Sequence, residues 1–124
     1  MLKIIEGLPP DVLGIEAVGT VTHDDYRSIL IPKAEAMLAR GSIKMLYVVG
    51  DQFTKFELEA LWDDGEFGIR HWREFSHVAV VTDIDWLRSM AAMFAPLIPA
   101  DFRLFRLSEM QAAKNWITAN KAAV

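Results

Sequence analysis

The residues that could carry out chemistry in this sequence are few and scattered. His23 is followed by Asp24 and Asp25, which could present an imidazole and two carboxylates to a metal ion. Asp63 begins a second acidic pair, and His71 follows it in the chain. Both groups lie at the expected ends of helices, where carboxylates commonly cap the backbone and suit the helix dipole. We therefore expect neither catalytic residues nor a metal site.

Motifs for covalent catalysis or phosphate binding are also absent from the sequence. There is no cysteine, which excludes thiol nucleophiles and cysteine-based metal centres and fits a reducing compartment. No serine lies in a G-x-S-x-G elbow, and neither G-x-G-x-x-G nor a P-loop motif occurs. We expect a protein that is not an enzyme and holds no cofactor. The remaining enzyme hypothesis would use His23 with the two aspartates, or His71 with Asp63.

The most informative residues are large and apolar. Seven aromatic and methionine side chains fall on two predicted helical regions in the middle of the chain: Trp62, Phe67, Trp72, Trp86, Met90, Met93 and Phe94. No charged residue occurs from Ser89 to Ala100, so the helix predicted there lacks a clear polar face. Such a helix must be covered by the rest of the domain, a second subunit, a lipid or a membrane surface. We predict that these seven side chains bind a ligand.

The elements that would position these side chains follow from the hydrophobic pattern. A chain of 124 residues is one domain's worth of sequence, so we expect a single domain over 1–124. The pattern predicts strands over 2–5, 12–21, 43–49, 76–82 and 102–107. Helices are predicted over 22–40, 54–62 and 69–72, from residue 83 or 85 to Pro96, and after Ser108. This order predicts an α/β fold with a mixed, mostly parallel five-stranded sheet, an N-terminal antiparallel hairpin and about four to five helices.

Several local signals refine these elements. Pro32 should kink or divide the first helix, and Gly41 should end it. The final helix should turn Met110, Ala113, Trp116 and Ile117 inward. The expected helix caps are Thr22 or Asp24 for the first helix, Asp83 or Asp85 for the helix before Pro96, and a capping box of Ser108 with Gln111 for the last.

The charge balance limits the partners and the location. Lys and Arg total 13 and Asp and Glu total 17, which gives a net charge of −4. A mildly acidic chain without a basic cluster is a poor nucleic-acid binder and does not dock on anionic lipid through charge. The sequence contains neither a signal-peptide pattern nor an apolar run of about 20 residues. We expect a cytoplasmic protein, at most peripheral to the membrane.

The sequence resembles a known family over most of its length. The segment LWDDGEFG from Leu61 to Gly68, then His71, Phe75, the run HVAVVTD and Trp86, is similar to the SpoIIAA-like family of bacterial STAS/SEC14-type domains. The tail is similar as well, through Phe105, Glu109, Trp116 and Ile117. The resemblance implies an α/β domain with a central mixed sheet and helices around it.

The resemblance implies two kinds of function. Anti-sigma-factor antagonists of the STAS type switch partner binding by phosphorylation of a serine or threonine just after the central strand, at the start of the next helix. The matching place here is 50–54, which lacks the Asp-Ser-Ser/Thr pattern and retains only Asp51 and Thr54, so Thr54 is the candidate phosphorylation site. SEC14-like domains instead hold lipophilic ligands under mobile helices.

We hypothesise a non-enzymatic binding domain that meets a lipophilic small molecule or a membrane surface through two mobile apolar helices. The alternative is a protein-interaction and regulatory module related to anti-sigma-factor antagonists, or a homodimerisation domain that buries the same apolar patch. Neither hypothesis involves nucleic acid.

Overall fold

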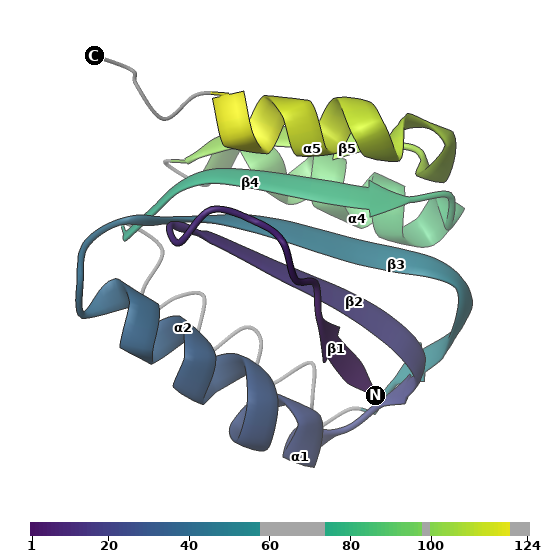
Figure 1. Cartoon of the computed structure of the whole chain (residues 1–124). Coiled ribbons are helices and arrows are strands. Elements are labelled where there is room, and N and C mark those ends of the chain that lie inside the picture. Colours follow the sequence, from purple (N-terminus) through teal and green to yellow (C-terminus); the bar gives the residue numbers. More distant parts are fainter. Residues whose placement is uncertain (58–73, 98–99, 120–124) are drawn as a thin grey trace.

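A five-stranded sheet forms the centre of the molecule. The computed structural model describes residues 1–57, 74–97 and 100–119. The strands lie in the order β1 (Leu2–Ile4), β2 (Val12–Val21), β3 (Ile43–Phe56), β4 (Phe75–Thr82) and β5 (Asp101–Phe105). β1 pairs antiparallel with β2, and β2 to β5 are parallel (Figure 1). The predicted mixed sheet with an N-terminal antiparallel hairpin is confirmed.

The hairpin depends on one glycine. Ile5 and Leu8, in the loop between β1 and β2, lie directly over Gly14 of β2. A Cβ atom at Gly14 would lie 2.5 Å from Leu8 Cδ1 and 2.9 Å from Ile5 Cβ, so only glycine permits this approach.

The first helical region contains three consecutive pieces: α1 (His23–Asp25), the π-helical η1 (Tyr26–Leu30) and α2 (Ile31–Leu38). Thr22 caps it as predicted, because its hydroxyl accepts from Asp25 N at 3.1 Å while the Asp25 carboxylate accepts from Thr22 N at 2.8 Å. Pro32 lies in the first turn of α2, directly after the π-helical turn. The chain stays helical from His23 to Leu38, so what the structure shows beside Pro32 is a change from π to α geometry rather than a division of the helix.

The remaining described helices are α4 (Asp85–Phe94), continued by the 3-10 turn η3 (Ala95–Leu97), and α5 (Met110–Ala119), preceded by the 3-10 turn η4 (Leu107–Glu109). Two predicted caps are wrong. Ile84 precedes α4 without a side-chain cap, and Asp83 Oδ1 instead accepts from Leu107 N at 3.0 Å. At the last helix, Glu109 Oε1 accepts from Arg106 N at 2.8 Å, so this pair replaces Ser108 and Gln111.

The predicted helix over 54–62 is wrong over 54–56, where β3 continues to Phe56. Its last residues pair with β2, Thr20 opposite Lys55 and Val21 opposite Phe56. Cross-strand pairing with the long β2 outweighs the local helical pattern here. Glu57 is not helical either, and its N–H donates to the carbonyl oxygen of Val21 at 2.8 Å. Residues 58–62, and the helix predicted over 69–72, lie outside the described residues. The described residues contain three helical regions, fewer than the four to five expected for the whole chain.

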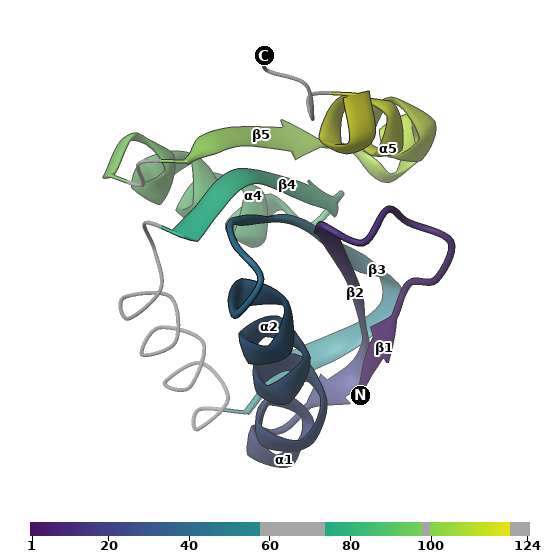
Figure 2. The same ribbon diagram turned by 60° about the vertical axis from the view of Figure 1, so that its left-hand side comes forward.

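The sheet has a hydrophobic cluster on each face. α1, η1 and α2 cover one face, where Leu13, Ile15, Tyr26 and Leu30 are buried. α5 covers the other face (Figures 1 and 2). The buried members of that second cluster are Val12, Leu46, Val48, Ala79, Val81, Phe105, Ala113 and Ile117. Ala113 and Ile117 point inward as predicted, with Met110 and Trp116 partly buried beside them.

Candidate functional site

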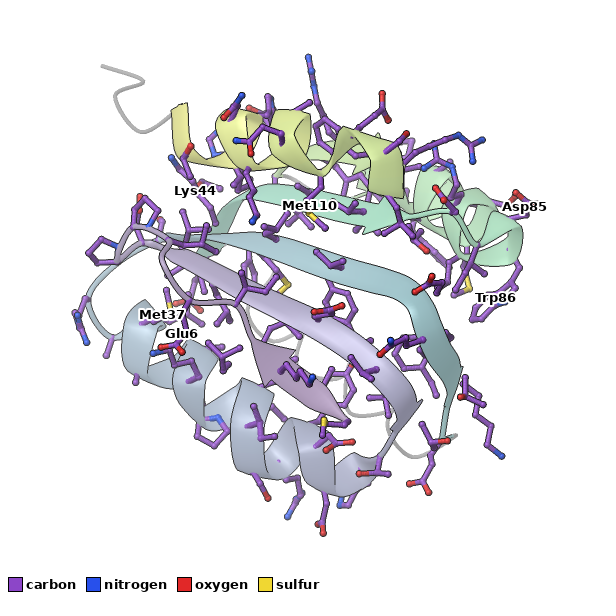
Figure 3. The ribbon with its side chains drawn as sticks, turned by 45° about the vertical axis from the view of Figure 1, so that its right-hand side comes forward. Glu6, Met37, Lys44, Asp85, Trp86 and Met110 are labelled. Atoms are coloured by element: carbon purple, nitrogen blue, oxygen red, sulfur yellow. The ribbon has the colours of Figure 1, made fainter. Side chains whose placement is uncertain are left out.

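The outer side of α4 and η3 carries large apolar side chains in contact with solvent. None of the residues of α4 is buried. Five side chains on this surface, which we call the α4 face, are exposed: Trp86 by 51%, Met90 by 39%, Met93 by 69%, Phe94 by 51% and Leu97 by 66%. In Figure 3, Trp86 lies at one end of α4 and projects away from the sheet. So many large apolar side chains together on one surface are typical of an interaction site.

The opposite side of α4 attaches the helix to the sheet through few groups. Leu87 is half-buried and packs against the cluster beneath α2. The Arg88 guanidinium donates from Nη1 to the carbonyl oxygen of Thr82 at 3.0 Å and to that of Phe105 at 2.9 Å. These contacts join α4 to the ends of β4 and β5, and none of the five side chains of the α4 face belongs to the two hydrophobic clusters of the described residues.

The α4 face is electrically neutral. Asp85 and Arg88 are the charged residues of α4, and none follows until Asp101. Arg88 is turned toward the sheet by its two carbonyl contacts, while Asp85 is exposed at the first residue of the helix. The arrangement can therefore bind an apolar surface by burial, but it offers no cluster of cations to an anionic group.

The structure gathers four of the seven predicted ligand-binding residues. Trp86, Met90, Met93 and Phe94 all belong to the α4 face. Trp62, Phe67 and Trp72 lie outside the described residues. Sequence reasoning had left Leu97 out of the site, although its spacing could have suggested it. Residues 86, 90 and 93 are separated by four and three residues, which keeps them on one side of α4, and 97 follows after four more, in η3.

A second polar group went unnoticed in the sequence. Lys44, His77 and Asp101 are register partners at the amino ends of β3, β4 and β5. The Lys44 side chain is 6% exposed, its Nζ atom has no hydrogen-bond partner among the described residues, and Asp11 Oδ2 lies 3.9 Å away. Figure 3 places Lys44 at the opposite end of the sheet from Trp86. Alternation within β3 could have placed Lys44 on a buried face, but composition alone marks lysine as a surface residue.

His77 is held by its neighbours. Its Nε2 lies 3.4 Å from Asp101 Oδ2, its Nδ1 lies 3.0 Å from Ser76 Oγ, and its ring meets Trp116 edge-on at 5.5 Å. Serine contacts histidine and histidine contacts aspartate, as in a catalytic triad. However, Ser76 and His77 are adjacent in one strand, and the Asp101 side chain is 78% exposed. The contacts therefore fit packing beneath α5 better than an enclosed nucleophile and base.

The predicted group at His23 proves to be a helix start. Asp25 belongs to the Thr22 capping box and also pairs with the amino group of Met1 at 3.3 Å. Burial by itself raises the pKa of the Asp25 carboxyl, but hydrogen bonds from Thr22 and the charge of the amino group outweigh it and hold that pKa below its ordinary 3.8. Among the residues that the structure describes, no three His, Asp or Glu side chains converge on a metal position. Asp63 and His71 lie outside the described residues.

A family model described as SpoIIAA-like matches residues 12–118. The chain belongs to the SpoIIAA-like family. A crystal structure of an uncharacterized protein of the DUF3478 family from Shewanella loihica PV-4, described as having a SpoIIAA-like fold, is similar to this SpoIIAA-like chain with a TM-score of 0.74 and 25% identity, over 94% of this chain and 93% of that one. No curated protein matches the chain. The resemblance inferred from the sequence is confirmed for family and fold.

Membership in the SpoIIAA-like family does not bring the expected phosphorylation geometry with it. Thr54 was expected at the start of a helix, but it lies exposed within β3. Among residues 1–57, 74–97 and 100–119, no helix begins at Thr54, so none of these helices would stabilise a phosphate there through its dipole. Modification of Thr54 stays a prediction.

The described helices do not include one that could cross a bilayer, since none combines sufficient length with sufficient apolar character. α4 has ten residues, about 15 Å at 1.5 Å per residue, against a hydrocarbon core of about 30 Å.

Proposed function

We propose that this SpoIIAA-like protein is a non-enzymatic binding domain that meets lipid, either a membrane surface or a single lipophilic molecule, through the α4 face. The exposure of five large apolar side chains on one side of α4 and η3 carries this proposal. None of the five is a member of either hydrophobic cluster within the described part of the chain, so they are open to a binding partner.

The shape and charge of α4 support a lipid as the occupant. A short helix with one apolar side can lie in the plane of a bilayer with that side immersed at the level of the headgroups. Trp86 and Phe94 suit the boundary between headgroups and acyl chains, and the methionines adapt to irregular surfaces. Because the α4 face lacks cations, its affinity would come from burial rather than from attraction to anionic headgroups.

The expected affinity is low. Full burial of one large apolar side chain contributes about 1.5–3 kcal/mol, and these side chains are already partly buried. Five such contributions, reduced by the cost of ordering and by incomplete immersion, correspond to reversible association at roughly micromolar to millimolar lipid. A weak and reversible contact suits a domain that visits a membrane or exchanges a ligand.

Co-sedimentation with phosphatidylcholine vesicles tests the proposal. The unmodified protein should pellet with the vesicles, and added salt should not release it, because no ion pairs hold it there. The double variant Trp86→Gln with Met93→Gln should lose most of the association. The matched control is Ile4→Gln, which removes an apolar side chain of 37% exposure from β1 and should bind as the unmodified protein does.

Two results would contradict this function. One is the absence of association with vesicles and of any lipid carried through purification from cells, measured by native mass spectrometry. The other is association that the double variant retains in full, because lipid would then bind elsewhere on the molecule.

A further inference from the structure

The α4 face has the spacing of a helix-to-helix contact. Trp86, Met90, Met93 and Leu97 are separated by four, three and four residues, the spacing of the apolar seam of a coiled coil. All four are exposed, by 39–69%. A seam with this spacing can pack against another apolar helix that runs along α4. The α4 of a second copy is such a helix, because it exposes the same apolar side chains.

Of the two symmetric ways in which the α4 face can meet a second copy of itself, the antiparallel one is favoured. If two copies pair antiparallel about a two-fold axis between Met90 and Met93, each Trp86 faces Leu97 of the second copy, and the four methionines meet at the centre. The two Asp85 carboxylates then lie at opposite ends of the contact. A parallel pair would bring both Asp85 side chains and both Trp86 rings together and would align the helix dipoles unfavourably.

The area and the charge of the α4 face both permit this contact. Each large side chain has on the order of 200 Å² of surface, so five side chains exposed by 39–69% offer roughly 500 Å² per copy. Two copies would bury about 1,000 Å², which is near the lower limit for a specific interface. No like charges meet along the seam, because Arg88 is occupied by the carbonyl oxygens of Thr82 and Phe105.

We propose that a second copy of this chain covers the α4 face in water, through an antiparallel α4–α4 contact, and that lipid binding separates the two copies. The dimer itself follows from the geometry of α4, whereas its role as the closed state of a lipid site rests on the proposed function. The equilibrium between the copies would regulate access to the α4 face, because the same side chains cannot contact both partners.

Cysteine cross-linking tests the direction of the contact, since the chain has no cysteine of its own. Under oxidation, a mixture of Met90→Cys and Met93→Cys proteins should form mixed disulfide dimers, and so should a mixture of Trp86→Cys and Leu97→Cys. Trp86→Cys alone should stay uncross-linked, because the two positions would lie roughly 16 Å apart along the helices. Cross-linking of Trp86→Cys alone that equals or exceeds the mixture would overturn the antiparallel arrangement.

Sedimentation equilibrium tests the dimer without cysteines. The unmodified protein should show a concentration-dependent dimer, and Met93→Glu should raise its dissociation constant more than about tenfold, since it places two carboxylates near the axis. Met93 is exposed by 69%, so the variant should keep the circular dichroism of the unmodified protein. A monomer at every concentration, or a dimer that Met93→Glu leaves intact, would overturn the proposal.

Vesicles separate this proposal from the proposed function. Adding phosphatidylcholine vesicles to the mixture of Met90→Cys and Met93→Cys before oxidation should lower the disulfide yield. If disulfides form and the vesicles neither bind the protein nor lower the yield, the lipid function and the proposed competition fail while the dimer stands. If vesicles bind the protein and no dimer forms at any concentration, the dimer fails while the lipid function stands.

Discussion

α4 and α5 are both ten-residue helices that follow a strand of the same sheet, yet they use their apolar residues in opposite ways. α5 places Ala113 and Ile117 against the sheet, fully buried, and turns Gln111 and Asn115 to solvent, where they bond to each other at 3.0 Å. α4 turns its tryptophan, methionines and phenylalanine to solvent. Its contacts with the sheet rest on the half-buried Leu87 and the Arg88 guanidinium.

The difference separates a helix that belongs to the core from a helix that presents a surface. The apolar residues of α5 already stabilise the fold, so a partner could use them only by dismantling the core. The exposed apolar residues of α4 stabilise the described fold little. Burying them against a partner would therefore be favourable, because it removes apolar surface that is still in contact with water. An amphipathic pattern alone does not tell these two uses apart, because it does not say which side faces the sheet.

The largest expected effect tests the core role of α5. Ile117→Ala should lower the free energy of unfolding by about 2–4 kcal/mol, because it removes a fully buried side chain and leaves a cavity. Urea denaturation followed by circular dichroism measures this change. A loss below about 1 kcal/mol would mean that α5 is no more firmly seated than α4, and the comparison would fail.

The next effect concerns how α4 is attached. Arg88→Ala should lower the free energy of unfolding by about 2 kcal/mol, since two charge-assisted hydrogen bonds are lost and two carbonyl oxygens lose their donor. Hydrogen exchange should increase along α4 more than along α5. Arg88→Lys should restore part of the protection, because an ammonium group can reach one of the carbonyls. Unchanged exchange in α4 would mean that Leu87 alone holds it.

A smaller effect of opposite sign is expected beneath α5. Lys44→Met should raise the free energy of unfolding by about 1 kcal/mol, because the apolar replacement keeps the volume and removes a buried ammonium group for which the described part of the chain offers no hydrogen-bond acceptor. Asp11 would keep its contact with solvent, since its side chain is 45% exposed. Thermal unfolding measures the change. A clear destabilisation by Lys44→Met would show that the ammonium group interacts favourably in solution.

Much of the fold followed from the sequence because its signals are local and repeated. The apolar runs of β3 and β4 predicted interior strands, and the bounds of β2 were met in full. The Thr22 cap was predictable because it depends on Asp25, only three residues away in the sequence. The missing cap of α4 could not be predicted, because Asp83 bonds to Leu107, twenty-four residues away.

The candidate site was predictable in composition but not in orientation. The charge-free stretch after Arg88 marked an apolar helix, and Trp86, Met90, Met93 and Phe94 do lie together on it. Which residues would face the sheet depended on Arg88 reaching the carbonyls of two different strands. The helix predicted at Thr54 is wrong for a related reason, since the conformation there is set by pairing between β3 and β2 rather than by neighbours in the sequence.

The comparison extends to the way each helix begins, because α1 has a charged cap whereas α4 has no side-chain cap. The Asp25 pKa is lower in the folded protein than its ordinary 3.8, so its stabilising contribution is complete above that value and is lost as the pH falls through the folded pKa. Asp25→Asn should therefore cost about 1 kcal/mol at neutral pH and less in acid. The free energy of unfolding of both proteins, measured from neutral pH down through the pKa of Asp25, checks the prediction. A difference between them that does not change with pH would contradict it.

The smallest expected effect is the sharpest test of what α4 is for. Met93→Gln should change the free energy of unfolding by less than about 0.5 kcal/mol, because the side chain is 69% exposed and gives the fold little. The same substitution should weaken association with vesicles and with a second copy, where the methionine would become buried. Urea denaturation at low protein concentration isolates the first effect from the second. If stability falls by as much as for Ile117→Ala, Met93 serves the core of the isolated chain, and the distinction between the two helices is lost.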